Sequence, residues 1–258
     1  MEENKTITLS IIISAIIVLI GLIISNNNKQ LTTNLYVTNT YLYILLAILF
    51  TTLTIVIMEI MKLNINNKKM NSYYLYLFFI SIIIIITFAV TSTQNVIFRH
   101  ILFILFTIAM GIFTYPIYVD SLSSDLLYKS IATVFVIVIG LTIVTNQYPK
   151  NYFDNWGPIL IISLSGLIIF ELFDLLFSSK EIDHGSQLKS KIFAMIGTAI
   201  LCGFIVYDTK KIYQHADQAL ECVKTTNNNL TCTDYPSRSL GLYLTILNLF
   251  SEINRLHK

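Results

Sequence analysis

Long apolar runs separated by short polar connections make up most of this sequence. A helix needs about 20 mostly apolar residues to cross the hydrocarbon layer of a bilayer, and seven runs approach that length. An eighth run near the C-terminus is shorter and more polar. Because runs this long show no alternation, they exclude a β-barrel and predict an all-α polytopic membrane protein. The predicted spans are residues 7–25, 42–61, 73–91, 97–119, 130–146, 157–178, 190–208 and 238–256.

Composition agrees with this prediction. Of 258 residues, 55% are hydrophobic and 12% are charged, and the mean hydropathy is +0.69, whereas soluble chains carry about 25% charged residues. The net charge of +2 and the lack of a basic stripe exclude nucleic acid as a partner, so the expected partner is the lipid bilayer. Heavy use of Ile and Asn indicates an A/T-rich genome, such as that of a parasite or a large DNA virus.

The first run, 7–25, is interpreted as a retained helix rather than a secretory signal. Its leading residues MEENKT contain two Glu against one Lys, and the apolar run is longer than the usual core of a signal peptide. With eight spans, ten of the 17 Lys and Arg residues fall on the N-terminal side of the membrane. The positive-inside rule therefore favours a cytoplasmic N-terminus.

A polar loop is expected over residues 213–237, before the last span. In the favoured orientation this loop lies outside the cell or in a lumen, where Cys222 and Cys232 are candidates for a disulfide and Asn229 for glycosylation. In the inverted orientation both cysteines stay reduced and the sequon is unused. Two unpaired cysteines and a chance sequon in an Asn-rich chain are the alternative. Cys202, inside an apolar run, is expected to be a packing residue.

No enzyme motif is present. The chain has no P-loop, no Gly-x-Ser-x-Gly and no His-Glu-x-x-His, and its four His are scattered. An intramembrane enzyme or a transporter would need a catalytic constellation or an inverted repeat, and we find neither. We therefore expect a non-enzymatic protein with no cofactor and no firm metal site.

Ionisable groups inside or beside apolar runs are more informative. Each costs about 2.5–3.5 kcal/mol at the membrane centre, so it tends to face water or a partner. Asp208 ends an apolar run and is a candidate cation contact; the alternative is a helix-end carboxylate paired with Lys211 among the headgroups. Arg99 is expected either to pair with a buried carboxylate or to snorkel. Glu171 and Asp174 are expected either to line the mouth of a pathway through the bundle or to be helix-end carboxylates in contact with water.

Two runs carry small or polar residues on one helix face. The face in the last run is expected to line a cavity or a polar seam with another helix, since lipid offers it no partner. For the weaker face in the run 97–119, close helix packing is the expected explanation, and Pro116 is expected to break that helix. The first face is formed by Gly241, Thr245, Asn248, Glu252 and Arg255, and the second by Thr107, Gly111, Thr114 and Tyr118.

Three short stretches occur in order near the C-terminus: VYDT at 206–209, DY at 234–235 and LYLTILNLF at 242–250. Together they resemble the C-terminal signature of the transmembrane Bax-inhibitor-motif proteins, which include the Lifeguard and Golgi anti-apoptotic proteins. That signature reads YDT, a loop, DY, then LYLDIINLF. The resemblance implies a Bax-inhibitor-type bundle of seven helices over residues 31–258, to which residues 1–30 add an extra N-terminal helix.

The resemblance also implies a mechanism, from which this chain departs at one position. The family pairs the aspartate of YDT with that of LYLD, and the pair is regarded as a pH sensor that gates a calcium leak. Asp208 matches the first aspartate, but Thr245 occupies the second position. A hydroxyl removes the repulsion between two carboxylates, so gating near neutral pH is expected to be blunted. Glu252 lies about 10 Å further along the helix and is not expected to replace the missing carboxylate.

Two functions follow as expectations. The resemblance implies a calcium-permeable, pH-modulated leak channel that inhibits apoptosis in an endoplasmic-reticulum or Golgi membrane, with the plasma membrane or a viral envelope as alternative locations. The alternative is a non-conducting protein that binds cell-death regulators or other membrane proteins. The missing second aspartate favours this alternative. The predicted ion pathway and pH latch consist of Asp208, Thr245, Asn248 and Arg99, with Gly241, Tyr243 and Glu252 as an accessory polar face.

Overall fold

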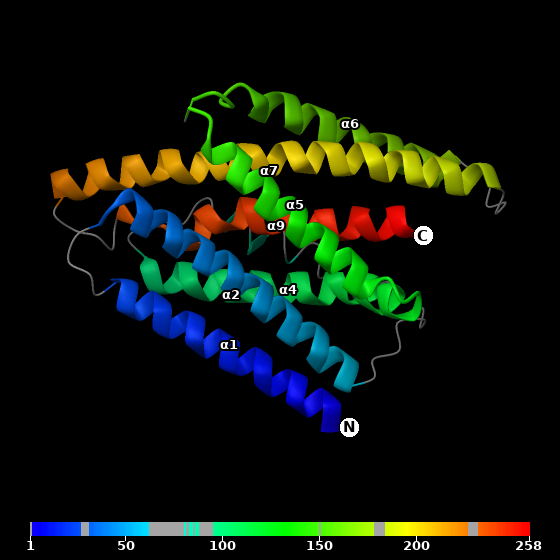
Figure 1. The fold of residues 1–258 in the computed structure, drawn as a ribbon, viewed down its shortest axis with the longest axis horizontal. Helices are drawn as coiled ribbons and strands as arrows, with labels where there is room; N and C mark the ends of the chain where they lie inside the picture. Colours follow the sequence, from blue (N-terminus) through cyan, green and yellow to red (C-terminus); the bar gives the residue numbers. More distant parts are fainter. Residues whose placement is uncertain are drawn as a thin grey trace. The chain divides into compact units, whose positions relative to one another are not determined.

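The regular structure in the described part of the chain is entirely helical (Figure 1). The prediction of an all-α fold is therefore confirmed. The helices are α1 (Glu2–Asn26), α2 (Thr33–Ile60), α4 (Val96–Ser123), α5 (Leu127–Asn146), α6 (Trp156–Phe177), α7 (His184–Thr226) and α9 (Tyr235–His257). This computed structural model describes residues 2–26, 31–61, 80, 83, 84, 86, 87, 95–149, 151–177, 184–226 and 232–258.

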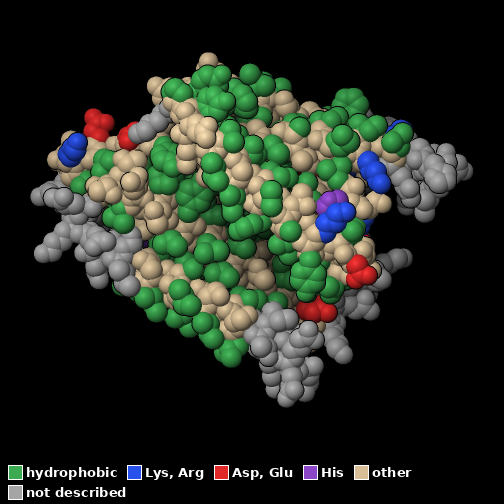
Figure 2. Space-filling model, viewed as in Figure 1, with side chains coloured by type: hydrophobic (Ala, Val, Ile, Leu, Met, Phe, Trp, Pro, Cys, Tyr) green, Lys and Arg blue, Asp and Glu red, His purple; other side chains and the backbone are tan. Residues whose placement is uncertain are grey.

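Among the described residues, four helical segments are long and apolar enough to cross a membrane: Thr33–Ile60, Val96–Ser123, Leu127–Asn146 and Leu188–Thr226. The shorter apolar helices Leu9–Ile23 and Trp156–Glu171 coincide with two further predicted spans. Most of the predicted span 73–91 lies outside the described residues. Large apolar side chains are exposed along these helices, and Figure 2 shows hydrophobic side chains over much of the face in view. Such a surface suits lipid as the surrounding solvent.

Two helices continue further than the sequence predicts. Helix α7 runs through the first half of the expected loop 213–237 and ends only at Thr226; its 43 residues span about 65 Å, roughly twice the hydrocarbon thickness. Its polar C-terminal part contains no Gly or Pro, so nothing in the sequence stops the helix. The predicted break at Pro116 is also wrong, since α4 continues to Ser123. A proline is tolerated in a membrane helix where neighbouring groups satisfy the freed carbonyl.

The chain divides into two compact units, each built from two segments. The first unit comprises Met1–Val119 and Ile212–Tyr243, and the second comprises Asp120–Lys211 and Leu244–Lys258. Helices α4, α7 and α9 each contribute residues to both units.

In the first unit, α1 packs against α2 (Figure 1), and α2 packs closely against α4. The close approach occurs at Gly111 of α4, where an added Cβ would lie 2.6 Å from Thr54 Cβ and 2.9 Å from the Thr51 carbonyl oxygen. One turn further along, Tyr115 packs with Ile55 and Met58 in a buried cluster. The packing role predicted for Gly111 is therefore confirmed.

In the second unit, small residues bring α7 close to α6 and α9. A Cβ at Gly203 would lie 2.6 Å from the side chain of Leu160, and a Cβ at Gly197 would lie 3.2 Å from the side chain of Glu252. Eleven residues after Gly197, Asp208 contacts Thr245, which precedes Glu252 by seven residues. Helices α7 and α9 therefore run antiparallel along this contact.

Replacing Gly111 by Ala tests the close packing of α2 and α4. Gly111→Ala is expected to lower the free energy of unfolding by about 1–3 kcal/mol, because the added methyl overlaps Thr54 and the backbone at Thr51. The measurement is thermal unfolding of the purified protein in detergent. Gly140→Ala is the matched control, since a Cβ there meets nothing within 4 Å and Ala is the better helix former by about 1 kcal/mol. Equal stability of the two variants would contradict the close approach.

Candidate functional site

Asp208 and Thr245, the two principal residues of the predicted latch, meet in the second unit. The hydroxyl of Thr245, on α9, donates a hydrogen bond of 3.2 Å to Asp208 Oδ2, on α7. Thr245 is buried and Asp208 is half-buried. An ionised carboxylate only accepts hydrogen bonds, so the Thr245 hydroxyl is oriented by its charged neighbour. The site thus offers one carboxylate and one hydroxyl oxygen, both of a kind that hard cations prefer.

A second polar group lies further along α9 in the same unit. Arg255 Nη1 donates to Glu171 Oε1 at 2.7 Å and to Glu252 Oε2 at 3.1 Å. These three side chains are between 16% and 33% exposed, so solvent screens the pairs only in part. Glu252 also lies against Gly197 of α7. The ion-paired group therefore joins α6, α7 and α9, and its two carboxylates leave a net negative charge.

The polar face predicted for α9 is divided in the structure. Thr245 is buried and Glu252 and Arg255 are half-buried, whereas Gly241 and Asn248 are exposed. The structure therefore brings Thr245, Glu252 and Arg255 to neighbouring helices but leaves Asn248 on the surface of its unit.

The second unit also contains buried polar atoms without a hydrogen-bond partner among the described residues. A buried polar atom without a hydrogen-bond partner lowers the stability of the folded state by about 1–3 kcal/mol. In native proteins, ordered water usually occupies such places. We therefore expect water inside this unit. No local pattern marks these atoms, because serine and threonine are also common in ordinary helices. They are Ser121 Oγ, Thr142 Oγ1, Thr198 Oγ1, Thr209 Oγ1 and Asn254 Oδ1.

Arg99, the fourth predicted pathway residue, forms an ion pair in the first unit. Its guanidinium binds Asp234 through two hydrogen bonds, of 3.0 Å to Oδ1 and 2.5 Å to Oδ2, and the two side chains are only 7% and 13% exposed. Asp234 Oδ1 also accepts the backbone N–H of Ser237 at 3.4 Å, so it caps the start of α9. Of the two expectations for Arg99, the structure shows pairing with a buried carboxylate.

Tyr243, assigned to the accessory polar face, is also in the first unit. Its side chain is fully buried, and its hydroxyl lies 2.5 Å from Thr51 Oγ1 on α2. A cluster that the sequence did not predict joins three helices, where Tyr43 of α2 contacts both His100 of α4 and Tyr235 of α9. No motif marks these residues, since they are distant in sequence and come together only in the fold.

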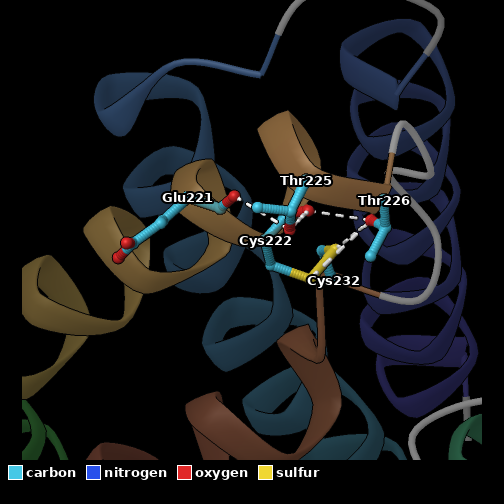
Figure 3. Close-up of a disulfide and its surroundings, with 5 residues drawn as sticks. All are labelled: Glu221, Cys222, Thr225, Thr226 and Cys232. Carbon is cyan, nitrogen blue, oxygen red and sulfur yellow. Dashed lines mark hydrogen bonds between the residues drawn. A yellow bond between two sulfur atoms is a disulfide. The ribbon is translucent and has the colours of Figure 1, made fainter.

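The structure contains a disulfide between Cys222 and Cys232 (Figure 3). It joins the C-terminal end of α7 to the residues just before α9, with the two Cα atoms 5.7 Å apart. The hydroxyls of Thr225 and Thr226 each donate to the Cys222 carbonyl at 2.8 Å, which ties down the last turn of α7. The candidate glycosylation site Asn229 lies outside the described residues.

The helices, their apolar surfaces and their polar contacts are those of an integral, multi-pass membrane protein. The family model described as "Inhibitor of apoptosis-promoting Bax1" matches residues 33–257 of this chain. The chain belongs to this family, whose members are membrane proteins of cell-death regulation. Helix α1 precedes the matched region.

Individual relatives are more distant and match only in part. Protein LIFEGUARD 3 of Arabidopsis thaliana is 27% identical over 154 residues, which are 59% of this chain and 54% of the relative. Protein LIFEGUARD 1 of the same plant is 29% identical over 121 residues, or 46% of this chain and 43% of the relative. The chain spans about half the length of the curated relatives it matches.

Removing one partner of the Arg99–Asp234 pair tests its contribution to the fold. Arg99→Gln is expected to lower the free energy of unfolding by about 3–5 kcal/mol, because it leaves the Asp234 carboxylate buried without its counter-charge. Thermal unfolding in detergent measures the effect, and adding Asp234→Asn should recover part of the loss. Arg238→Gln, at an exposed position of α9, is the control and should change little. A mild Arg99→Gln phenotype would argue against a structural role for the pair.

Thiol counting tests the disulfide. Protein isolated from eukaryotic cells without reductant, then denatured and treated with a maleimide–polyethylene glycol, should gain one adduct, at Cys202, and three after reduction. Cys222→Ser should instead give two adducts without reductant, because Cys232 loses its partner. Three adducts on the unreduced wild-type protein would show that the bond does not form in cells.

Proposed function

We propose that this protein is a cation-permeable leak channel of an intracellular membrane, that calcium is the ion it conducts, and that it inhibits apoptosis. Membership of the Bax-inhibitor family supports the role in cell death. The contact between Asp208 and Thr245 carries the proposal of conduction. Calcium and pH modulation rest on the family resemblance together with this contact.

The second unit has the chemistry that a cation pathway requires. Asp208 supplies a carboxylate, the group that attracts cations in channels, and Thr245 supplies a neutral oxygen beside it. The unpartnered hydroxyl and amide atoms of the same unit favour internal water, which would hydrate a passing ion. Further along α9, the carboxylates of Glu171 and Glu252 outnumber the guanidinium of Arg255. The Asp208–Thr245 contact and the ion-paired group of Glu171, Glu252 and Arg255 therefore both favour cations over anions.

The Cys222–Cys232 disulfide supports an orientation for this pathway. Disulfides form and persist in oxidising compartments, so the C-terminal end of α7 faces a lumen or the outside of the cell. With eight spans, that orientation places the N-terminus in the cytoplasm, in agreement with the distribution of Lys and Arg. An endoplasmic-reticulum or Golgi membrane fits both features.

A non-conducting function is the second candidate. It is favoured by Thr245, which removes one carboxylate of the family's pair, and by the exposure of Asn248 and Gly241 on α9. Polar and small residues on the surface of a membrane helix promote association with another helix. In this case the protein would act by binding cell-death regulators or other membrane proteins.

Calcium flux into liposomes that contain the purified protein tests conduction, measured from about pH 6 to 8. Asp208→Asn is expected to lower the flux by about tenfold, the change that a loss of ~1.4 kcal/mol of ion stabilisation produces. Thr245→Asp should restore the repulsion between two carboxylates and make the pH dependence steeper. Asp217→Asn, which neutralises an exposed carboxylate of the same helix, should leave the flux unchanged.

The flux experiment also separates the two functions. No flux from any variant would contradict a channel. If no variant conducts calcium, and cells that express Asp208→Asn are still protected from cell death, the partner-binding function would be established.

A further inference from the structure

The first unit contains a cavity of about 410 Å³ between α1, α2, α4 and the residues that begin α9. Its volume is within the range of about 300–1,000 Å³ that is typical of small-molecule sites. The cavity is lined only by residues of this unit and does not include Asp208 or Thr245. It therefore shares no lining residue with the Asp208–Thr245 contact.

One end of the cavity is polar but carries no ionised side chain of Asp, Glu, Lys or Arg. His100 Nδ1 lies 2.7 Å from the Val96 carbonyl, which can only accept, so this nitrogen carries the proton. In the neutral ring Nε2 then accepts from the Tyr43 hydroxyl at 2.6 Å. Beside it, Asn39 Nδ2 donates to the Tyr235 hydroxyl at 3.3 Å, and the Tyr43 and Tyr235 rings stack with centroids 5.6 Å apart. This polar end offers hydroxyl, amide and imidazole groups for hydrogen bonding.

The rest of the cavity is apolar. Along α2 the lining positions 39, 43, 46 and 50 follow one helix face and change from Asn and Tyr to Leu and Phe. Along α4, His100 is followed by Phe103 and Ile104. A molecule lying along these helices would therefore meet hydrogen-bonding groups at one end and hydrocarbon along its length.

Helix α1 lines one side of the apolar part with Leu19, Leu22 and Ile23. The helix is anchored by buried residues on its other turns, such as Ala15 and Val18. The family match begins at residue 33, so this wall lies outside the matched region. The cavity therefore depends in part on residues that the family model does not cover.

We propose that this cavity binds a neutral lipid with a small hydroxyl-bearing head, such as a sterol or a monoacylglycerol. The head would lie against Tyr43, His100 and Asn39, and the hydrocarbon would lie between Leu46 and Phe50 of α2 and the side chains of α1. An anionic headgroup is disfavoured, because a buried charge without a counter-charge is costly. Several hydroxyl and amide groups in mutual contact can instead reorient to accept or donate to one more hydroxyl.

Photolabelling in nanodiscs tests this proposal. The purified protein is irradiated with a diazirine-bearing sterol, a diazirine-bearing monoacylglycerol or, as the charged comparison, a diazirine-bearing phosphatidylserine, each against an excess of its unlabelled form. At least one neutral probe should give saturable labelling, and the probe that does so identifies the kind of lipid. Leu22→Trp, which fills the cavity, should lower that labelling by about tenfold or more.

Two further variants separate binding from folding. Tyr43→Phe keeps the ring and removes only the hydroxyl, so labelling should fall by about fivefold, as the loss of one hydrogen bond implies. Ile17→Trp adds the same bulk as Leu22→Trp on a side chain of α1 that is 62% exposed and should leave labelling unchanged. Asp208→Asn should also leave it unchanged, since the residue is not part of the cavity.

Several outcomes would overturn the proposal. The first is labelling that an excess of unlabelled lipid does not reduce. The second is labelling by the phosphatidylserine probe that is as strong as labelling by the neutral probes. The third is an equal loss of labelling in Leu22→Trp and Ile17→Trp. A loss of calcium flux in Asp208→Asn has no bearing on these results, so the two proposals stand or fall separately.

Discussion

The start of helix α9 depends on the carboxylate of Asp234. This group accepts two hydrogen bonds from Arg99 and one from the backbone of Ser237, so the same residue pairs a buried charge and caps the helix. The Arg99 and Asp234 side chains are only 7% and 13% exposed, so each charge must find its partner within the protein. The register of α9 set at Asp234 then decides which residues it presents further along within the first unit, such as Tyr243 to Thr51.

The two units solve the problem of buried polar groups in different ways. Around the cavity of the first unit, hydroxyl, amide and imidazole groups pair with one another, Tyr43 with His100 and Asn39 with Tyr235, and the charges of Arg99 and Asp234 neutralise each other. In the second unit, charged and neutral groups are mixed, and several buried hydroxyls lack a partner among the described residues. Unpartnered polar atoms call for water, whereas mutually satisfied ones do not. This difference is why we assign a neutral ligand to the first unit and an ion to the second.

The apolar runs predicted the helices because length and hydropathy are local properties, and the motif YDT together with LYLT predicted the Asp208–Thr245 contact. Other features needed the fold. Periodicity shows which residues of α9 share a face but not what covers that face, so the exposure of Asn248 could not be foreseen. Polarity alone suggested a loop after Asp208, although the absence of Gly and Pro allowed α7 to continue. The partner of Arg99 lies 135 residues away, beyond any local pattern.

The replacement of an aspartate by Thr245 changes what a proton can do at Asp208. Two carboxylates share a contact only while one is protonated, since two negative charges at this distance repel. A carboxylate and a hydroxyl keep their hydrogen bond in both states: the hydroxyl donates to the ionised group, and the protonated carboxyl can donate to the hydroxyl. Protonation of Asp208 would therefore remove a charge without separating α7 from α9. If the protein conducts, pH would act on the attraction of the cation rather than on the packing of the helices.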